Sequence, residues 1–309
     1  RQNEELALRV ARSLKTPKAI VDAGVWCKKT GSWAWSTIKA HRMASERAAQ
    51  RTGWNANKPE FEVEQPLRPE DLPPMAGNEH LQDLANRLTI AFENPDKFAR
   101  MGATPPKGAV LVGPPGTGKT LFARHLAARL QVPLLTPDPA KMFESPERIA
   151  VMFQVARDNA PCVILLDEAE KLICKPSLFG SIPSALGSLL TEIEGISSLE
   201  GVMVIATTNN PNIYPALLRS GRLSECREVL NPLQKDREAM WFAYLQGRPI
   251  KGNGKSLQDW VAVLSKASRG FTGADIAEVL RRAAGDAVAA GKDEMELSGL
   301  VRACDNVRW

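Results

Sequence analysis

Several features that would mark other classes of protein are absent from this chain of 309 residues. Its five cysteines are scattered, odd in number and include no C-x-x-C pair, which argues against a disulfide framework or a zinc site and favours a reducing compartment such as the cytoplasm. No apolar run approaches the ~18 residues of a membrane span and no signal peptide is evident, while an anchor outside these residues stays open. There is no H-E-x-x-H motif, so no zinc-peptidase signature lies in this sequence.

Positive charge is concentrated at the N-terminal end. Residues 1–58 hold 12 Lys and Arg against four Asp and Glu, a net of +8, and because the whole chain is +5 the remainder carries −3. Four tryptophans, Trp26, Trp33, Trp35 and Trp54, lie in the same segment. Three interpretations of residues 1–57 stay open: binding to an anionic partner (lipid headgroups or nucleic acid), a face that docks an adaptor or substrate, and a small helical domain with a tryptophan core.

The length, with 44% hydrophobic and 24% charged residues, predicts a globular protein of two or three domains. Residues 1–57 show helical periodicity, and the prolines of residues 58–74 predict an extended linker. Residues 75–230 alternate strand-like and helix-like segments, which predicts a doubly wound α/β domain with a mostly parallel sheet. Residues 231–309 show only helical patterns and predict a smaller helical domain. The expected strands are 109–112, 132–135, 162–166 and 202–206, and the expected C-terminal helices are 236–246, 257–268 and 273–290.

The strongest motif is the eight-residue run Gly113-Pro114-Pro115-Gly116-Thr117-Gly118-Lys119-Thr120, which fits the phosphate-binding pattern G-x-x-x-x-G-K-[ST]. It follows an apolar strand and precedes a helical stretch that begins at Leu121, as the pattern requires. Backbone N–H groups of such a loop and the helix N-terminus attract phosphate. Lys119 can reach the outer phosphates, and the Thr120 hydroxyl can hold Mg²⁺. The alternative is a Gly-Pro turn without a ligand, and the pattern arises by chance in only about one chain in 100 of this size.

Two adjacent carboxylates, Asp167 and Glu168, end the apolar run 163–166. At the C-terminal end of a parallel strand they would lie where ligands bind. Asp167 could hold Mg²⁺, directly or through water, and Glu168 could polarise the water that attacks the γ-phosphate. The alternative is that Asp167 caps a helix. A phosphate-binding loop about 50 residues upstream favours the metal-site interpretation.

Taken in order, five motifs resemble the AAA family of ATPases, within the protein-remodelling clade that includes the AAA proteases and the proteasomal ATPases. The resemblance runs from about residue 69 to the C-terminus. It rests on 105–120, 167–168, 205–211, 216–223 and 270–275. It implies a P-loop NTPase sheet with a C-terminal helical lid domain, an ATP hydrolase that needs Mg²⁺, and assembly into a homo-oligomeric ring, expected to be a hexamer.

The resemblance also implies roles for residues outside the phosphate loop. Asn209 matches the sensor that orients water beside the γ-phosphate, although an Asn before Pro211 could simply form a turn. Arg219 and Arg222 match the arginine fingers that reach the neighbouring subunit's nucleotide, the alternative being surface ion pairs.

Adenine contacts are expected from both domains. Ala76 and Gly77 precede the large domain's first helix. Gly273 and Ala274 match the start of the family's sensor-2 helix, with Ala274 where many relatives carry an arginine. Met240 and Tyr244 match positions that line the base, although both could equally belong to the helix core.

The expected pore loop departs from the family pattern. Met142 and Phe143 are predicted to contact a polypeptide substrate, but the glycine that usually follows is missing, which puts processive threading in doubt. Residues 175–184 would form the second pore loop and lack an arginine-rich start. Residues 194–196 lie where relatives carry an intersubunit signalling turn.

The favoured hypothesis is a ring-forming ATPase that couples ATP binding and hydrolysis to remodelling or unfolding of protein substrates. The main alternative is a nucleic-acid-acting motor or loader that uses the basic N-terminal segment. A third is a ring that binds nucleotide only as a scaffold, against which the intact Asp167-Glu168 pair and the two arginines argue.

Overall fold

The structure is a computed structural model, and it describes residues 61–64, 66–138, 146–170, 184–196, 201–212, 215–219, 221–251, 254 and 256–307. The basic segment 1–57, the pore-loop residues Met142 and Phe143, and nearly all of the expected second pore loop lie outside the described residues.

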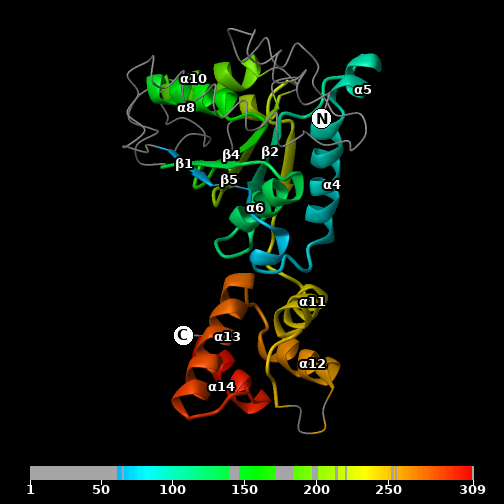
Figure 1. The fold of residues 1–309 in the computed structure, drawn as a ribbon, viewed down its shortest axis with the longest axis vertical. Coiled ribbons are helices and arrows are strands. Elements are labelled where there is room, and N and C mark those ends of the chain that lie inside the picture. Colours follow the sequence, from blue (N-terminus) through cyan, green and yellow to red (C-terminus); the bar gives the residue numbers. More distant parts are fainter. Residues whose placement is uncertain are drawn as a thin grey trace, which may run out of the picture.

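A six-stranded sheet with the order β1-β3-β4-β5-β2-β6 forms the centre of the larger part of the molecule (Figure 1). The strands are β1 (Phe61–Glu64), β2 (Gly108–Val112), β3 (Leu134–Pro137), β4 (Cys162–Leu166), β5 (Val202–Thr208) and β6 (Glu225–Glu228). All neighbouring strands are parallel except β1, which runs antiparallel to β3. Every residue of β2, β4 and β5 is buried, as expected for a parallel sheet covered on both faces. The predicted α/β fold class is confirmed.

Strand β1 corrects the prediction that residues 58–74 form only an extended linker. Phe61–Glu64 pair with Leu134–Pro137, and Glu64 forms an ion pair with Arg124 at 3.1 Å. Prolines stand on either side of this stretch but not within it, so its backbone is free to add an edge strand. Strand β6 was also missed, because its sequence Glu-Cys-Arg-Glu gives no apolar run.

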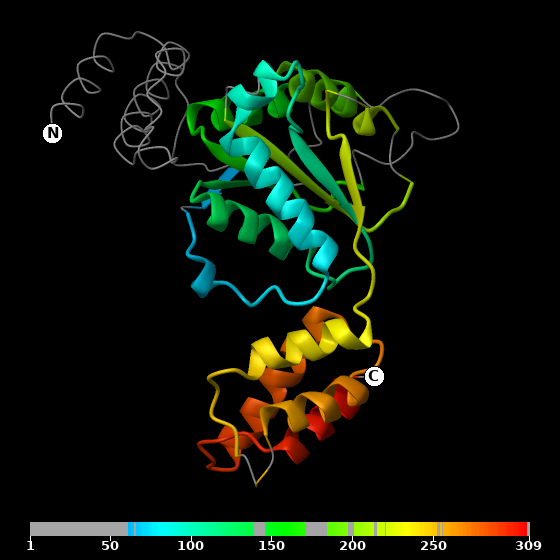
Figure 2. The same cartoon turned by 90° about the vertical axis from the view of Figure 1, so that its right-hand side faces the viewer.

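Helices cover both faces of the sheet (Figures 1 and 2). Helices α4 (Glu79–Glu93) and α6 (Lys119–Leu130) pack on one face, where Leu84, Leu88 and Phe122 are fully buried. Helices α8 (Pro146–Asp158) and α10 (Ser184–Gly195) pack on the other, with Phe153 and Leu189 in the core. The short helix α5 (Pro95–Arg100) and the 3-10 helices Pro69–Asp71 and Pro215–Leu218 complete this part.

The C-terminal helices form a separate apolar cluster, which we call the lid. It consists of α11 (Gln234–Leu245), α12 (Leu257–Ala267), α13 (Gly273–Ala289) and α14 (Leu297–Val307), the last of which was not predicted individually. Trp241 and Trp260 are buried at its centre. Buried Arg237 donates to the carbonyl oxygens of Pro232 and Ser265, which fixes the start of α11 against the end of α12. Among the described residues, no helix is long and apolar enough to cross a bilayer.

Candidate nucleotide site

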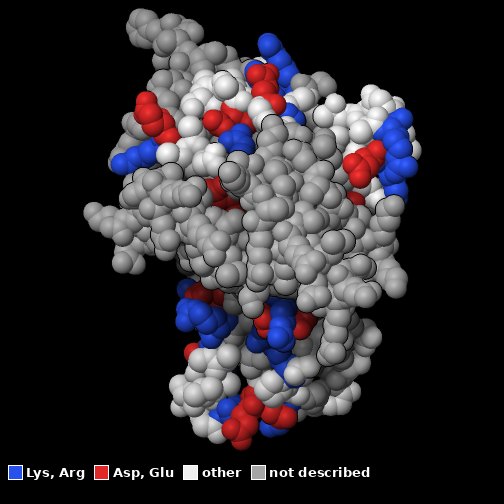
Figure 3. All heavy atoms as spheres, turned by 45° about the horizontal axis from the view of Figure 1, so that its top comes forward, with Lys and Arg blue, Asp and Glu red and all other residues white. Residues whose placement is uncertain are grey.

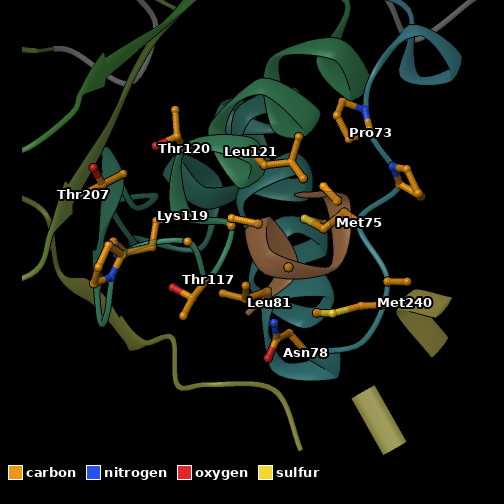
Figure 4. Close-up of a pocket in the computed structure, with 18 of the residues that line it drawn as sticks. Pro73, Met75, Asn78, Leu81, Thr117, Lys119, Thr120, Leu121, Thr207 and Met240 are labelled. Carbon is orange, nitrogen blue, oxygen red and sulfur yellow. The ribbon is translucent and has the colours of Figure 1, made fainter. Parts of the chain in front are cut away.

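A cavity of about 400 Å³ lies where the C-terminal ends of β2, β4 and β5 meet the lid (Figure 4). The sheet edge forms one wall of the cavity and the lid forms a second. The third wall is the segment 73–78, which leads into α4 and which we call the strap. Figure 4 shows Lys119, Thr120 and Thr207 on one side of the cavity, and Met75 of the strap with Met240 of α11 on the other. The volume suits a small-molecule ligand, and the sheet edge is the one at which open α/β sheets bind ligands.

The phosphate-binding loop connects β2 to α6 and curls at two glycines. Gly116 and Gly118 have φ values of +76° and +94°, a left-handed conformation that glycine adopts without strain. Residues 115–121 of the predicted set all line the cavity. Gly113 and Pro114 do not line it, and they contribute their carbonyl oxygens instead. A Cβ on Gly113 would collide with the backbone carbonyl of Val229, so the loop requires glycine there.

The lid docks directly on this loop. The Ala274 N–H at the start of α13 donates to the Gly116 carbonyl at 3.2 Å. A Cβ on Gly116 would lie 2.7 Å from the Thr272 hydroxyl, so the loop and helix approach each other closely only because residue 116 is glycine. The predicted contacts Gly273 and Ala274 therefore lie at the cavity.

Lys119 is buried and its ammonium is fully engaged. Nζ donates to the carbonyls of Gly113 and Pro114 at 2.8 and 2.7 Å and to Oδ1 of Asn209 at 2.9 Å. Desolvation lowers the pKa of Lys119, and the nearby charges of Asp167 and Glu170 oppose this shift. A desolvated cation held by neutral oxygens is poised to exchange them for phosphate oxygens.

Asp167 lies opposite the loop and accepts hydrogen bonds from two hydroxyls. Thr120 Oγ1 lies 3.1 and 3.0 Å from its two carboxylate oxygens, and Thr207 Oγ1 also donates to Oδ1. The helix-cap alternative is not what the structure shows, because both oxygens face these side chains. A carboxylate beside a hydroxyl supplies the hard oxygen ligands that fit Mg²⁺, which usually keeps waters and phosphate oxygens as its other ligands.

Glu168 lies on the turn after β4 and lines the cavity with an exposed side chain. Its φ of +50° is left-handed, which for a residue other than glycine costs on the order of 1–3 kcal/mol. Non-glycine residues keep such a conformation where the surrounding structure requires it, and here the turn directs Glu168 toward the cavity.

Asn209 follows β5 and contacts the site through both ends of its amide. Oδ1 accepts from Lys119, and Nδ2 donates to Glu170 Oε1 at 3.4 Å. The turn around Pro211 is stabilised by the residue after Asn209, because Asn210 Oδ1 accepts the N–H of Asn212 at 2.9 Å. Asn209 is thus placed at the cavity and Asn210 makes the turn.

The far end of the cavity is apolar. Met240 is 7% exposed and Tyr244 half-buried, and burial raises the pKa of the Tyr244 hydroxyl. Both residues line the cavity and also pack in the lid cluster, so each belongs to the helix core and to the cavity wall. Ala76 lines the cavity, whereas Gly77 does not. The sequence did not single out the other lining residues, which are Pro73, Pro74, Asn78, Leu81, Thr207, Thr208 and Ala277.

Comparison with known proteins agrees with this geometry. Residues 109–230 match the sequence model of the "ATPase family associated with various cellular activities (AAA)". These residues form an AAA domain. The ATP-dependent zinc metalloprotease FtsH 2 of Methylacidiphilum infernorum is 35% identical over 246 residues, 76% of this chain and 38% of that protein. The mitochondrial inner membrane m-AAA protease component yta12 of Schizosaccharomyces pombe is 34% identical over 245 residues, 75% of this chain and 31% of that protein.

The chain thus spans well under half the length of the curated relatives it matches. The predicted AAA family is confirmed for residues 109–230, and an AAA ATPase domain binds nucleotide.

Both predicted finger arginines of the AAA domain lie away from its cavity. Arg219 is exposed, and the Arg222 N–H donates to the Arg219 carbonyl at 3.1 Å. The Arg222 side chain forms an ion pair with Glu194 at the end of α10. Neither arginine is among the described residues that line the cavity.

Proposed function

We propose that this chain is a subunit of a ring-forming ATPase that uses ATP binding and hydrolysis to remodel or unfold protein substrates. The observation that carries the proposal is one cavity in which Lys119 donates to Asn209 and Thr120 donates to Asp167, while Arg222 does not line it. The relatives named above are an ATP-dependent protease and a protease component, which supports a polypeptide as the substrate.

The cavity suggests how ATP would bind. The triphosphate would occupy the curled loop, where Lys119 exchanges the carbonyls of Gly113 and Pro114 for phosphate oxygens. Mg²⁺, when bound, neutralises phosphate charge, and Thr120 and Asp167 would hold it. Adenine would lie between the strap and the face of α11 that carries Met240.

Hydrolysis would follow from the polar groups at the phosphate end. Glu168 would take a proton from water as the water oxygen attacks the γ-phosphorus and the bond to the ADP oxygen breaks. Asn209 would orient that water through its amide. Because neither arginine lines its own cavity, Arg219 and Arg222 would stabilise the transition-state charge in the next subunit, which makes the complete site a property of a ring, expected to be a hexamer.

The location and the alternatives follow from other observations. The described cysteines, Cys162, Cys226 and Cys304, form no disulfide, and a reducing, cytoplasmic setting is part of the proposal. On the face shown in Figure 3, Lys and Arg side chains lie beside Asp and Glu side chains. The support for a nucleic-acid partner is the basic segment 1–57, which lies outside the described residues.

Substrate trapping tests the proposed function. Glu168→Gln should hold ATP and retain its substrate, while the matched control Lys119→Ala, which cannot hold ATP, should release it. Mass spectrometry of the material that co-purifies in ATP should find a polypeptide with Glu168→Gln only. Nuclease-sensitive material would overturn the protein-remodelling proposal in favour of the nucleic-acid alternative, and equal recovery with both variants would contradict ATP-dependent capture.

A further inference from the structure

A single buried carboxylate joins the strap to the lid. Asp236, the third residue of α11, is 8% exposed. One oxygen, Oδ2, accepts the Leu233 N–H at 3.0 Å and so caps its own helix. The other, Oδ1, accepts the Asn78 N–H at 3.1 Å, from a residue 158 positions earlier in the sequence. Capping therefore uses only half of this carboxylate, and the other half bonds to the strap.

The strap is bent so that this bond can form. Gly77 and Asn78 have φ values of +73° and +52°, two left-handed residues in succession. A Cβ on Gly77 would lie 2.7 Å from the Cβ and 3.0 Å from the Cα of Asp236, closer than side chains tolerate. The strap and α11 can thus approach this closely only with glycine at residue 77.

The same face of α11 continues into the cavity. Asp236, Met240 and Tyr244 are spaced four residues apart, so they lie one above another along one face of the helix. Met240 and Tyr244 line the apolar end of the cavity, and Ala76 and Asn78 line it from the strap. Figure 4 labels Met240 and Asn78 at this end. The two walls at this end come from different parts of the chain, and Asp236 bonds one to the other.

We propose that Asp236 is a positioning residue for the adenine base, which holds the strap against α11 so that the apolar slot is closed before ATP arrives. The inference rests on the proposed function, because it assumes that the base occupies this end. The phosphate end of the cavity is built from β2, β4, β5 and α6, which Asp236 does not join. Loss of the Asp236 bond should therefore weaken binding of the base and leave binding of the phosphates unchanged.

Calorimetric titration of ATP and of inorganic tripolyphosphate separates these effects. Asp236→Ala should bind ATP about tenfold more weakly than wild type because the slot is no longer preorganised, while its affinity for tripolyphosphate stays within about twofold. In assembled protein, the variant should raise KM for ATP and leave kcat nearly unchanged, since the base takes no part in the chemical step.

Asp259→Ala is the matched control. Asp259 is also the third residue of its helix and caps α12 in the same way, with Oδ2 accepting the Ser256 N–H at 2.8 Å. Helix α12 contributes none of the described residues that line the cavity. Equal ATP affinity in the two variants, or a parallel loss of ATP and tripolyphosphate binding in Asp236→Ala, would overturn the proposal.

A second pair of variants changes the strap itself and leaves the Asp236 cap of α11 in place. Gly77→Ala should push the strap off Asp236 and lower ATP affinity without lowering tripolyphosphate affinity. Gly102→Ala introduces the same left-handed strain at a φ of +69° with no atom within 4 Å of the new Cβ, and it should change neither affinity. A Gly77→Ala protein that binds ATP as Gly102→Ala does would contradict the proposal. If wild type bound neither ligand, the proposed function itself would fail, and the role of Asp236 with it.

Discussion

Arg222 is held by Glu194 of the same chain. Its Nη2 lies 2.6 Å from Glu194 Oε1, and its Nε donates to the same oxygen at 2.8 Å. Lys107 Nζ donates to the carbonyls of Ile193 and Glu194 at 3.1 and 2.8 Å, so the end of α10 that carries this carboxylate is itself fixed. The Glu194 side chain is 57% exposed, whereas that of Arg222 is only 13% exposed, so the pair is partly buried. In the proposed ring, Arg222 would exchange Glu194 for the γ-phosphate of a neighbouring subunit's nucleotide.

Removal of the Lys119 ammonium should abolish nucleotide binding. Lys119→Ala deletes the cation that bonds to the carbonyls of the phosphate loop and that would neutralise the outer phosphates. Titration with a fluorescent ATP analogue measures the effect, and circular dichroism checks that the variant is folded. Wild-type affinity in the folded variant would refute the assignment of the phosphate-binding loop.

Glu168→Gln should bind ATP normally and hydrolyse it about 10²–10⁴-fold more slowly, because the amide cannot accept the proton of the attacking water. The contacts of Lys119, Thr120 and Asp167 stay in place, so the loss should appear in kcat and not in affinity. Single-turnover hydrolysis with purified protein measures it. A wild-type rate would remove Glu168 from its proposed role.

As the pH is raised, the affinity for ATP should begin to fall before the pH reaches 10.5, the ordinary pKa of a lysine side chain. Desolvation lowers the pKa of Lys119 in the free protein, and bound phosphate would raise it again, so binding takes up a proton as the pH approaches the lowered pKa. Calorimetry in two buffers of different ionisation enthalpy reports this uptake. Flat affinity with no proton uptake up to pH 10.5 would show that the shift has no bearing on nucleotide binding.

Deletion of residues 1–57 should leave the ATPase rate of the assembled ring unchanged and abolish partner recruitment. The reason is that positive charge is concentrated in this part of the chain, with a net of +8 over residues 1–58 against −3 for the remainder, which contains the ATPase site. The ATPase rate of the truncated ring and its capture of substrate by the Glu168→Gln form are the two measurements. A collapse of the rate in rings that still assemble would assign the segment to the ATPase unit.

The fold and the phosphate end of the site could be predicted wherever the pattern that specifies them lies within one short stretch of sequence. Buried parallel strands give continuous apolar runs, which is why β2, β4 and β5 were found, and the phosphate loop is contiguous in sequence. Strands β1 and β6 were missed because short polar edge strands depend on pairing with distant residues. Asn78 and Asp236 are 158 positions apart, and no pattern in either segment indicates their bond. Thr207 lies on β5 two residues before Asn209, and it could have been found because alternate residues of an extended chain face the same side.

The central claim is that the active site is completed by the next subunit, and mixing two inactive variants tests it most directly. Arg222→Ala should bind ATP normally but hydrolyse it about 10³–10⁵-fold more slowly, with Arg219→Ala similar or milder. Lys119→Ala should fail to bind ATP. Mixed rings of Arg222→Ala and Lys119→Ala subunits contain interfaces that pair an intact phosphate loop with an intact arginine, so the account predicts that ATPase activity returns on mixing. No recovery in rings shown to be mixed, or wild-type hydrolysis by Arg222→Ala alone, would contradict it.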